Sequence, residues 1–414
     1  MFASPLRLDL YLRCTWETPV RETLDFWPPL PIEIFLDLDR PYDVDNIIAA
    51  LKHSDRVRGI WILNLISSSS QLERLVPMMQ EPFPRLTFLQ LEAADIALVL
   101  PDLFLGGSAP RLQTLVLSGI PFPGLPRLLL SATDLSHLSL EEIPHTGYIS
   151  PEAMVIGLST LTRLTCLIIK FKSPTSRHLH RRGRCLSPLT RAILPALTKL
   201  EFRGISEYLE DLVARIDVPR FQSLDISFFN QVIFDIQQLS YFIGHTRILR
   251  SSSHAKIIVA DDHVEINLYP TDPPNNLKLR IYCRAIDWQV WSMGQICNQF
   301  SLLLSIVERL DIHEDYYEWT SNRVDMEDTQ WLELFRPFIA VRTLRISEKL
   351  QPLILPALQE LTGERATEVL PALASLYLQK YKPSISDRTI ESFIAARQHS
   401  DHPVTVHPWE GLRL

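Results

Sequence analysis

Histidines are the clearest candidates for side-chain chemistry in this sequence. His178 and His180 form an H-x-H pair, and His399, His402 and His407 gather near the C-terminus. Imidazole is a common zinc ligand, but neither group has Cys or carboxylate partners at ligand spacing. The five cysteines are far apart and never form a C-x-x-C pair, so they indicate neither a zinc knuckle nor a disulfide framework. We therefore predict no metal site.

Catalytic motifs point the same way. The sequence contains no G-x-G-x-x-G, G-x-x-x-x-G-K-S/T, G-x-S-x-G or H-E-x-x-H motif. Its 414 residues include 30 prolines and only 13 glycines, which argues against Gly-rich phosphate loops. We expect no cofactor and no enzymatic activity. A hydrolase hidden in residues 250–300 is the alternative, and it would need a nucleophile and a base in contact there.

One basic stretch and one acidic stretch stand out. Residues 170–188 contain Lys170, Lys172, Arg177, Arg181, Arg182 and Arg184, with Ser-Pro pairs at Ser173 and Ser187. We interpret this stretch as an exposed insertion loop; a nuclear-import or nucleic-acid patch switched by phosphorylation is the alternative. Residues 313–328 are acidic and predict a solvated loop, with a contact for a basic partner as the alternative.

The overall charge and hydropathy bear on location and on partners. The chain has 41 Lys plus Arg against 48 Asp plus Glu, a net charge of −7, which makes nucleic acid or anionic lipid an improbable ligand. No apolar stretch approaches the roughly 20 residues that a membrane helix needs. There is no signal-peptide pattern and no N-x-S/T sequon. We predict a cytoplasmic or nuclear protein that does not bind membranes.

Repeats of the pattern L-x-x-L-x-L organise most of the chain. Its first apolar position recurs at residues 57, 86, 112, 135, 164, 197 and 221, at intervals of 29, 26, 23, 29, 33 and 24 residues. These are leucine-rich-repeat lengths. Further copies begin near residues 307, 341 and 373, and alternating strands are predicted from Leu6 and from Ile32. Only degenerate strands are visible between residues 250 and 300.

The segments between the strands have helix signals. Ser150-Pro151-Glu152 has the pattern of an N-cap followed by a first-turn proline and an acid, and Asp235 with Gln238 has capping-box spacing. A short amphipathic helix is predicted from Ser206. Proline also recurs two residues before the first apolar position of a strand, where it ends the preceding helix. These prolines are Pro84, Pro110, Pro195, Pro219 and Pro371.

The predicted fold is α/β: a leucine-rich-repeat solenoid with a curved parallel sheet, helices on its convex side and irregular repeats. Residues 1–380 would form the solenoid, irregular at about 250–300, and residues 381–414 a C-terminal cap. That cap would consist of a helix at 386–397 and a last strand at 404–406. One strand and one helix cannot bury an apolar face alone, so stacked neighbours would supply the core.

Residues between the core leucines of each strand would face outward on the concave side of the sheet, and we predict a protein partner there. We expect the following to contact it: Trp61, Phe88, Gln90, Val116, Ser139, Ile168, Glu201, Asp225, Asp311, Arg345 and Tyr377.

Longer segments carry a family resemblance. Among them are PVRETLDFWPPLPIEI (19–34), IPHTGYISPEAM (143–154), LPALQELTGERATEVLPAL (355–373) and FIAARQHSDHPVTVHPWEG (393–411). Over nearly its whole length the chain resembles the F-box-associated leucine-rich-repeat proteins of mushroom-forming fungi. The resemblance implies a substrate receptor of a cullin-RING (SCF-type) ubiquitin ligase, in which an F-box binds a Skp-type adaptor and the repeats hold a protein substrate.

The sequence departs from that family at the F-box, which is expected as roughly 40 to 50 residues of helix ahead of the repeats. LPIEIF at residues 30–35 echoes the start of an F-box, but its alternating apolar residues favour a strand. Adaptor binding would therefore require an F-box upstream of residue 1, and no residue here is assigned to it. The alternative function is a leucine-rich-repeat interaction scaffold without a ligase role.

Overall fold

The computed structural model describes residues 9–36, 43–63, 73–93, 99–174, 191–245, 252–270, 276–315, 328–361, 365, 367–379 and 387–410. The chain forms two compact units. Unit 1 comprises residues 1–204 and 211–221, and unit 2 comprises residues 205–210 and 222–414. The two His178/His180 candidates and most of the predicted basic and acidic loops lie outside the described residues.

The strands of unit 1 pair in parallel in the order β1-β2-β3-β4-β5-β6-β7-β9, which is almost their order in the sequence. The short strands β8 and β10 pair in parallel with each other and form a separate two-stranded sheet. The strands are β1 (Leu10–Arg13), β2 (Ile32–Phe35), β3 (Val57–Ile62), β4 (Phe88–Glu92), β5 (Thr114–Ser118), β6 (His137–Ile143), β7 (Cys166–Phe171), β8 (Ala192–Ile193), β9 (Lys199–Gly204) and β10 (Ile216–Asp217).

The repeated leucines meet in register and form the core of unit 1. Leu89, Leu115, Leu138, Leu167 and Leu200 follow one another across β4, β5, β6, β7 and β9, and all five are fully buried. Apolar residues two positions later form a second buried row. Because successive side chains of a strand point to opposite faces, this register places every repeat's core residues on one face of the sheet.

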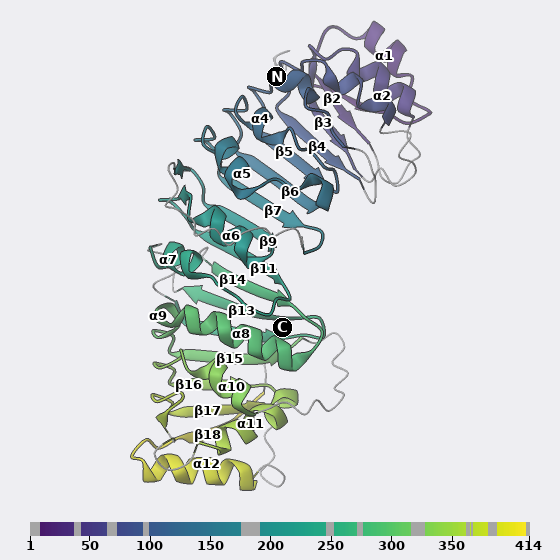
Figure 1. Ribbon diagram of the computed structural model, residues 1–414. Coiled ribbons are helices and arrows are strands. Elements are labelled where there is room, and N and C mark those ends of the chain that lie inside the picture. Colours follow the sequence, from purple (N-terminus) through teal and green to yellow (C-terminus); the bar gives the residue numbers. More distant parts are fainter. Residues whose placement is uncertain are drawn as a thin grey trace, which may run out of the picture. The chain divides into compact units, whose positions relative to one another are not determined.

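Helices cover that face (Figure 1). In unit 1 they are α1 (Val20–Phe26), α2 (Val44–Leu51), α4 (Leu125–Leu129) and α5 (Pro151–Leu158), and α6 (Ser206–Val213) follows at the boundary. The predicted start at Ser150 is confirmed, since its side chain accepts a hydrogen bond from the backbone N–H of Ala153 at 3.3 Å. Asp43 caps α2 in the same way through the N–H of Asp45. Both caps satisfy backbone donors that the helix leaves unpaired.

Each recurrent proline lies four residues before a strand, inside a tight turn. At Pro110 the turn is closed by a hydrogen bond from the N–H of Leu112 to the carbonyl of Ala109 at 3.1 Å, and at Pro195 by the equivalent bond from Leu197 to Leu194 at 3.2 Å. Proline occupies the second turn position, which its fixed φ favours. The proline signal in the sequence therefore marks the turn that delivers the chain into the next strand.

A ladder of hydroxyl groups follows these turns. Ser136, Thr165 and Thr198 each donate both the backbone N–H and the side-chain hydroxyl to one carbonyl of the preceding repeat, with hydroxyl distances of 3.0, 2.8 and 3.1 Å. Thr87 does the same with the carbonyl of Arg58. A carbonyl oxygen has two lone pairs, so it can accept both bonds. The ladder fixes the register of successive repeats at the point where each strand begins.

Unit 2 departs from the predicted parallel arrangement. Its strands follow the order β11-β14-β13-β12-β15-β16-β17-β18, in which β13 is antiparallel to both neighbours and the other pairs are parallel. The strands are β11 (Ser223–Phe229), β12 (Ser252–Val259), β13 (His263–Pro270), β14 (Asn276–Tyr282), β15 (Arg309–Glu314), β16 (Thr343–Ile346), β17 (Ser375–Gln379) and β18 (Thr405–Trp409).

The irregularity that the sequence predicts at about 250–300 corresponds to a change of strand direction, since β13 is antiparallel to both of its neighbours. Only residues 260–262 connect β12 to β13, and a connection this short can join only antiparallel strands, because a parallel crossover needs a dozen residues or more. The region is a hairpin plus one further strand inserted into the repeat sheet. Each strand still buries its alternate apolar residues on the face that carries the helices.

The helices of unit 2 are α7 (Gln237–His245), α8 (Ile286–Gln299), α9 (Ser301–Leu304), α10 (Asp328–Phe335), α11 (Gln351–Gln359) and α12 (Asp387–His399). The helix and the last strand predicted near the C-terminus correspond to α12 and β18. Arg397 of α12 is buried and donates to the carbonyls of Leu370 and Leu373 at 3.0 and 3.1 Å, so it ties the cap to the turn before β17.

The predicted cap of α7 is different from the one observed. The N–H groups of Gln238 and Leu239 donate to the carboxylate of Glu210, at 2.8 and 2.7 Å, where Asp235 was expected. A carboxylate from an earlier helix satisfies the same donors as a local cap and also favours the positive end of the helix dipole.

Both units are thus α/β leucine-rich-repeat structures with a largely parallel sheet. One face of each sheet is buried under helices, and we call the other its open face. No helix in the part of the chain that the structure describes is both long and apolar enough to cross a membrane.

We predict that Leu115→Ala lowers the free energy of unfolding by about 2 to 5 kcal/mol, because Leu115 is fully buried in the leucine row. Val116→Ala, one residue further on the open face, should cost less than about 1 kcal/mol. Urea denaturation of both variants measures the difference. Equal losses would contradict the assignment of the two faces.

Candidate functional site

Aromatic rings form a ladder on the open face of unit 1. Trp61 of β3 stacks on Phe88 of β4 with ring centroids 4.4 Å apart, and Phe35 of β2 lies 6.4 Å from Trp61. All three rings are partly exposed. Such pairs are stabilised by ring geometry as well as by burial. We call Phe35, Trp61 and Phe88 the aromatic ladder; sequence reasoning identified the last two and missed Phe35.

Gly59 makes this stacking possible. Gly59 pairs with Phe88 across the two strands, and the ring of Trp61 folds back over the glycine to reach Phe88. A Cβ atom at position 59 would lie 2.3 Å from Cζ3 of Trp61, far inside the contact distance of two carbons. The absence of a side chain at 59 is therefore what sets the position of the tryptophan ring.

The middle of this face contains both polar and apolar residues, and some of them are more buried than predicted. Gln90 donates to Glu92 at 2.7 Å, and Val116 is partly exposed. Ser139 and Ile168 lie on the predicted face but are only 1% and 8% exposed; the hydroxyl of Ser139 donates to Glu141 at 2.9 Å. Ser139 and Ile168 are therefore covered by neighbouring side chains and are not themselves available for contact with a partner.

Glu201 belongs to a charge cluster across β6, β7 and β9. Lys199 and Lys170 donate to its two carboxylate oxygens at 2.5 and 2.9 Å, and Lys170 also reaches Glu141 at 3.4 Å. Burial raises the pKa of Glu201, but the hydrogen bonds from Lys199 and Lys170 outweigh it and hold the pKa below its usual range. Two lysines and two glutamates leave this cluster neutral.

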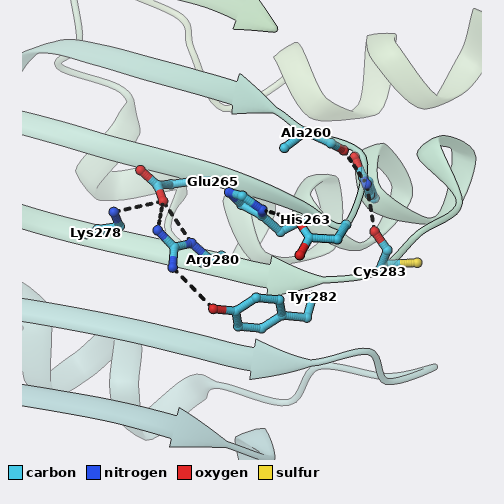
Figure 2. Close-up of polar contacts among 9 residues, drawn as sticks. Ala260, His263, Glu265, Lys278, Arg280, Tyr282 and Cys283 are labelled. Atoms are coloured by element: carbon cyan, nitrogen blue, oxygen red, sulfur yellow. Dashed lines mark hydrogen bonds and ion pairs between the residues drawn. The ribbon is translucent and has the colours of Figure 1, made fainter. Parts of the chain in front are cut away.

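Unit 2 contains a second cluster, centred on Glu265 of β13 (Figure 2). Lys278 and Arg280 of β14 both donate to one oxygen of Glu265, at 2.9 and 2.5 Å, and Asn267 donates to the other at 2.7 Å. Arg280 also donates to the hydroxyl of Tyr282. Asp225 of β11 lies in register with Lys278. Of these residues the sequence had indicated only Asp225.

A third cluster surrounds Asp311 of β15. Arg309 binds its carboxylate with two nitrogens at 2.9 and 2.6 Å, His254 lies at 3.0 Å and Arg345 at 3.9 Å. Burial raises the pKa of Asp311, but the hydrogen bonds from His254 and Arg309 outweigh it and keep the pKa well below its usual range. Asp311 is therefore a buried anion that holds cations in place.

Arg345 connects this cluster to aromatic rings. Its guanidinium carbon lies 5.2 Å from the centroid of Tyr377 and 5.7 Å from that of Trp409. Tyr377 stacks on His407 at 5.0 Å, and Trp409 meets His313 edge to face at 5.1 Å. The predicted residues Asp311, Arg345 and Tyr377 are thus brought together, with His313 and Trp409 as contributors that sequence reasoning missed.

Within the described ranges, no group of three or more His, Cys, Asp or Glu side chains could hold a metal ion. Two of the histidines near the C-terminus lie on different elements. His399 of α12 forms a hydrogen bond with the carbonyl of Ala395, and His407 lies on β18.

Comparison with known proteins adds little to this geometry. No family model matches the chain, and no curated protein matches it. A solved structure to which it is similar is the leucine-rich repeat-containing protein LegL7 from Legionella pneumophila, with a TM-score of 0.28 and 12% identity over 96% of this chain and 99% of that one. The fold assignment rests on the strand order and the repeated turns, and membership of the fungal F-box family stays a prediction.

His313 supplies a prediction about pH. Burial, and after it the charge of Lys256, lowers the pKa of His313 to about 4. The folded chain thus disfavours the protonated form, so the contribution of His313 to stability is complete above the unfolded pKa of about 6.5 and is lost as the pH falls towards 4.

Between pH 7 and pH 4 the wild-type free energy of unfolding should therefore fall by on the order of 2 to 3 kcal/mol relative to His313→Phe. Phenylalanine keeps a ring against Trp409 but does not titrate. Urea denaturation across this pH range measures the difference. Parallel pH profiles for the two proteins would rule out a buried neutral His313.

Proposed function

We propose that this chain is a non-enzymatic leucine-rich-repeat protein that binds a protein partner on the open face of its sheet, inside the cell. The aromatic ladder of Phe35, Trp61 and Phe88 carries this proposal. Large rings left partly exposed on the face without helices have the chemistry of interface anchors, because aromatic side chains contribute much of the binding energy of protein interfaces.

The rigidity of the open face also supports binding. The ring of Trp61 is held between Phe35 and Phe88. Glu201 is paired with two lysines, and Asp311 is paired with Arg309 and Arg345. Side chains that are already ordered lose little conformational freedom when a partner binds. Strands place these groups at fixed spacing, which suits recognition of a protein surface.

A first prediction concerns Trp61. Trp61→Ala should weaken binding of the partner by about tenfold or more, since truncating an aromatic anchor commonly costs over 1 kcal/mol. The matched control is Trp27→Ala: Trp27 is 50% exposed at the end of α1, outside the open face. Quantitative affinity purification of wild type and both variants from the native cells measures the loss.

The variants must remain folded, which circular dichroism and thermal denaturation check. Two results would refute an interface at the aromatic ladder. In the first, Trp61→Ala recovers the same partner proteins as wild type. In the second, Trp27→Ala loses the partner to the same extent as Trp61→Ala.

The finer proposal is that the partner is a substrate for ubiquitination and that the protein is the recognition subunit of an SCF-type ligase. The resemblance of its sequence to fungal F-box-associated repeat proteins is what supports it. Binding to a Skp-type adaptor would come from an F-box, to which no residue of this sequence is assigned. A repeat scaffold without a ligase role remains the second candidate.

Purification of the full-length protein from its own cells separates these two. The ligase proposal predicts a Skp-type adaptor and a cullin among the recovered proteins, together with substrates that accumulate when the gene is deleted. Recovery of partners without adaptor or cullin would contradict the ligase role and leave the scaffold.

A further inference from the structure

Carboxylates and cations lie at different depths on the open face of unit 2. The side chains of Glu265 and Asp311 are 5% and 2% exposed, whereas those of Lys278, Arg280, Arg309 and Arg345 are 23% to 36% exposed. The anions lie beneath the cations they hold. A partner that approaches this face therefore meets guanidinium and ammonium groups, which have donors left over for further hydrogen bonds.

Lys256 adds a cation to the middle of this surface. It lies on β12, partly exposed, and among the described residues it forms no ion pair with a carboxylate. Its charge reaches His313, whose protonation it disfavours. The open-face positions of β11 to β18 carry five Lys and Arg side chains and three carboxylates, an excess of two positive charges. We call Lys256, Lys278, Arg280, Arg309 and Arg345 the cationic patch.

Strand register arranges part of this patch in a row. Lys278 is paired with Asn267, Asn267 with Lys256, Lys256 with Asp311, and Asp311 with Arg345. Lys278, Lys256 and Arg345 therefore lie on every second strand. Neighbouring strands are about 4.8 Å apart, so these cations recur about every 9.6 Å across the sheet.

That spacing matches an extended peptide. A polyproline II segment rises about 3.1 Å per residue with three residues per turn, so every third side chain lies on the same side, about 9.3 Å apart. Carboxylates three residues apart could thus each meet one cation of the row. Tyr377 and Trp409, which pack on Arg345, and Tyr269, which packs on His254, provide apolar surface beside it.

We propose that the open face of unit 2 binds an acidic segment of the partner protein, in an extended conformation with Asp or Glu about every third residue. This inference rests on the proposed function and names the chemistry of the partner. A nucleic acid fits less well, because it carries a negative charge on every nucleotide, whereas this face has an excess of only two positive charges.

Peptide binding to the full chain tests the proposal. The probe is a fluorescent peptide of about ten residues with Glu at every third position, separated by Ser and Pro. Its comparisons are an isomer with the Glu residues adjacent, a version with Gln for Glu, and a single-stranded oligouridylate. Fluorescence anisotropy should show the spaced Glu peptide binding tightest, with affinity falling as salt rises from about 50 to 300 mM.

Substitutions locate the site. Lys256→Gln and Arg345→Gln should each weaken the spaced peptide by about three- to tenfold, because each removes one charge contact. In Arg345→Gln, Asp311 keeps Arg309 and His254 as partners. The matched control is Lys349→Gln, which removes one exposed charge in the 3-10 helix Glu348–Leu350, outside the strands that carry the cationic patch, and should leave the affinity unchanged.

Several results would overturn the inference: equal affinity for the Glu and Gln peptides or for the two Glu isomers, tighter binding of the oligouridylate, or unchanged affinity in folded Lys256→Gln and Arg345→Gln. If one of these results is found and Trp61→Ala still weakens binding of the partner, the acidic-segment inference is wrong but the open face remains the proposed interface. If the spaced peptide binds as expected while Trp61→Ala recovers every partner, the aromatic ladder is wrong and the acidic site stands.

Discussion

The rest of the structure depends on one constraint: each strand buries one row of apolar side chains against helices and leaves its other row uncovered. Leu115 and its partners in register form the buried row, and the turns at Pro110 and Pro195 return each repeat to the same register. Helices cover one face only, so the opposite face must be stable in water with side chains of its own. What those side chains are determines what the protein can bind.

The open face meets that requirement by pairing its side chains with one another. In unit 1 rings stack because Gly59 leaves room for Trp61. In unit 2 Glu265 and Asp311 are buried, and the cations that pair with them are more exposed. Burying a carboxylate is costly, and several hydrogen bonds from Lys, Arg and His offset the cost in each case. The same arrangement orders the groups that the proposed partner would contact, so under the proposed function stability and recognition would use the same contacts.

Much of this architecture could be predicted from sequence because it is local. The L-x-x-L-x-L pattern, the cap at Ser150 and the recurrent prolines each act within a few residues, and all correspond to elements of the structure. The hairpin of β12 and β13 was missed because alternation identifies strands but not their direction. The short link at 260–262 was the available signal.

The site was predicted less completely, for a different physical reason. Alternation correctly placed Ser139 and Ile168 on the open face, but their burial depends on side chains of neighbouring strands. Glu265 with Arg280 and His313 with Trp409 are contacts between strands, and the second pair is far apart in the sequence. Polar or charged residues alternating with apolar ones at 264–268 and 277–281 indicated the first pair. Nothing in the sequence indicated the second.

The most direct test of the open face as the binding surface is hydroxyl-radical footprinting of the full-length protein with and without its purified partner. Its tryptophans report on both sides of the sheet: Trp61 and Trp409 on the open face, and Trp27 and Trp288, both partly exposed, on α1 and α8. The account predicts that the partner protects Trp61 or Trp409 from oxidation and leaves Trp27 and Trp288 as reactive as before. Protection of the helix tryptophans, with Trp61 and Trp409 unchanged, would contradict it.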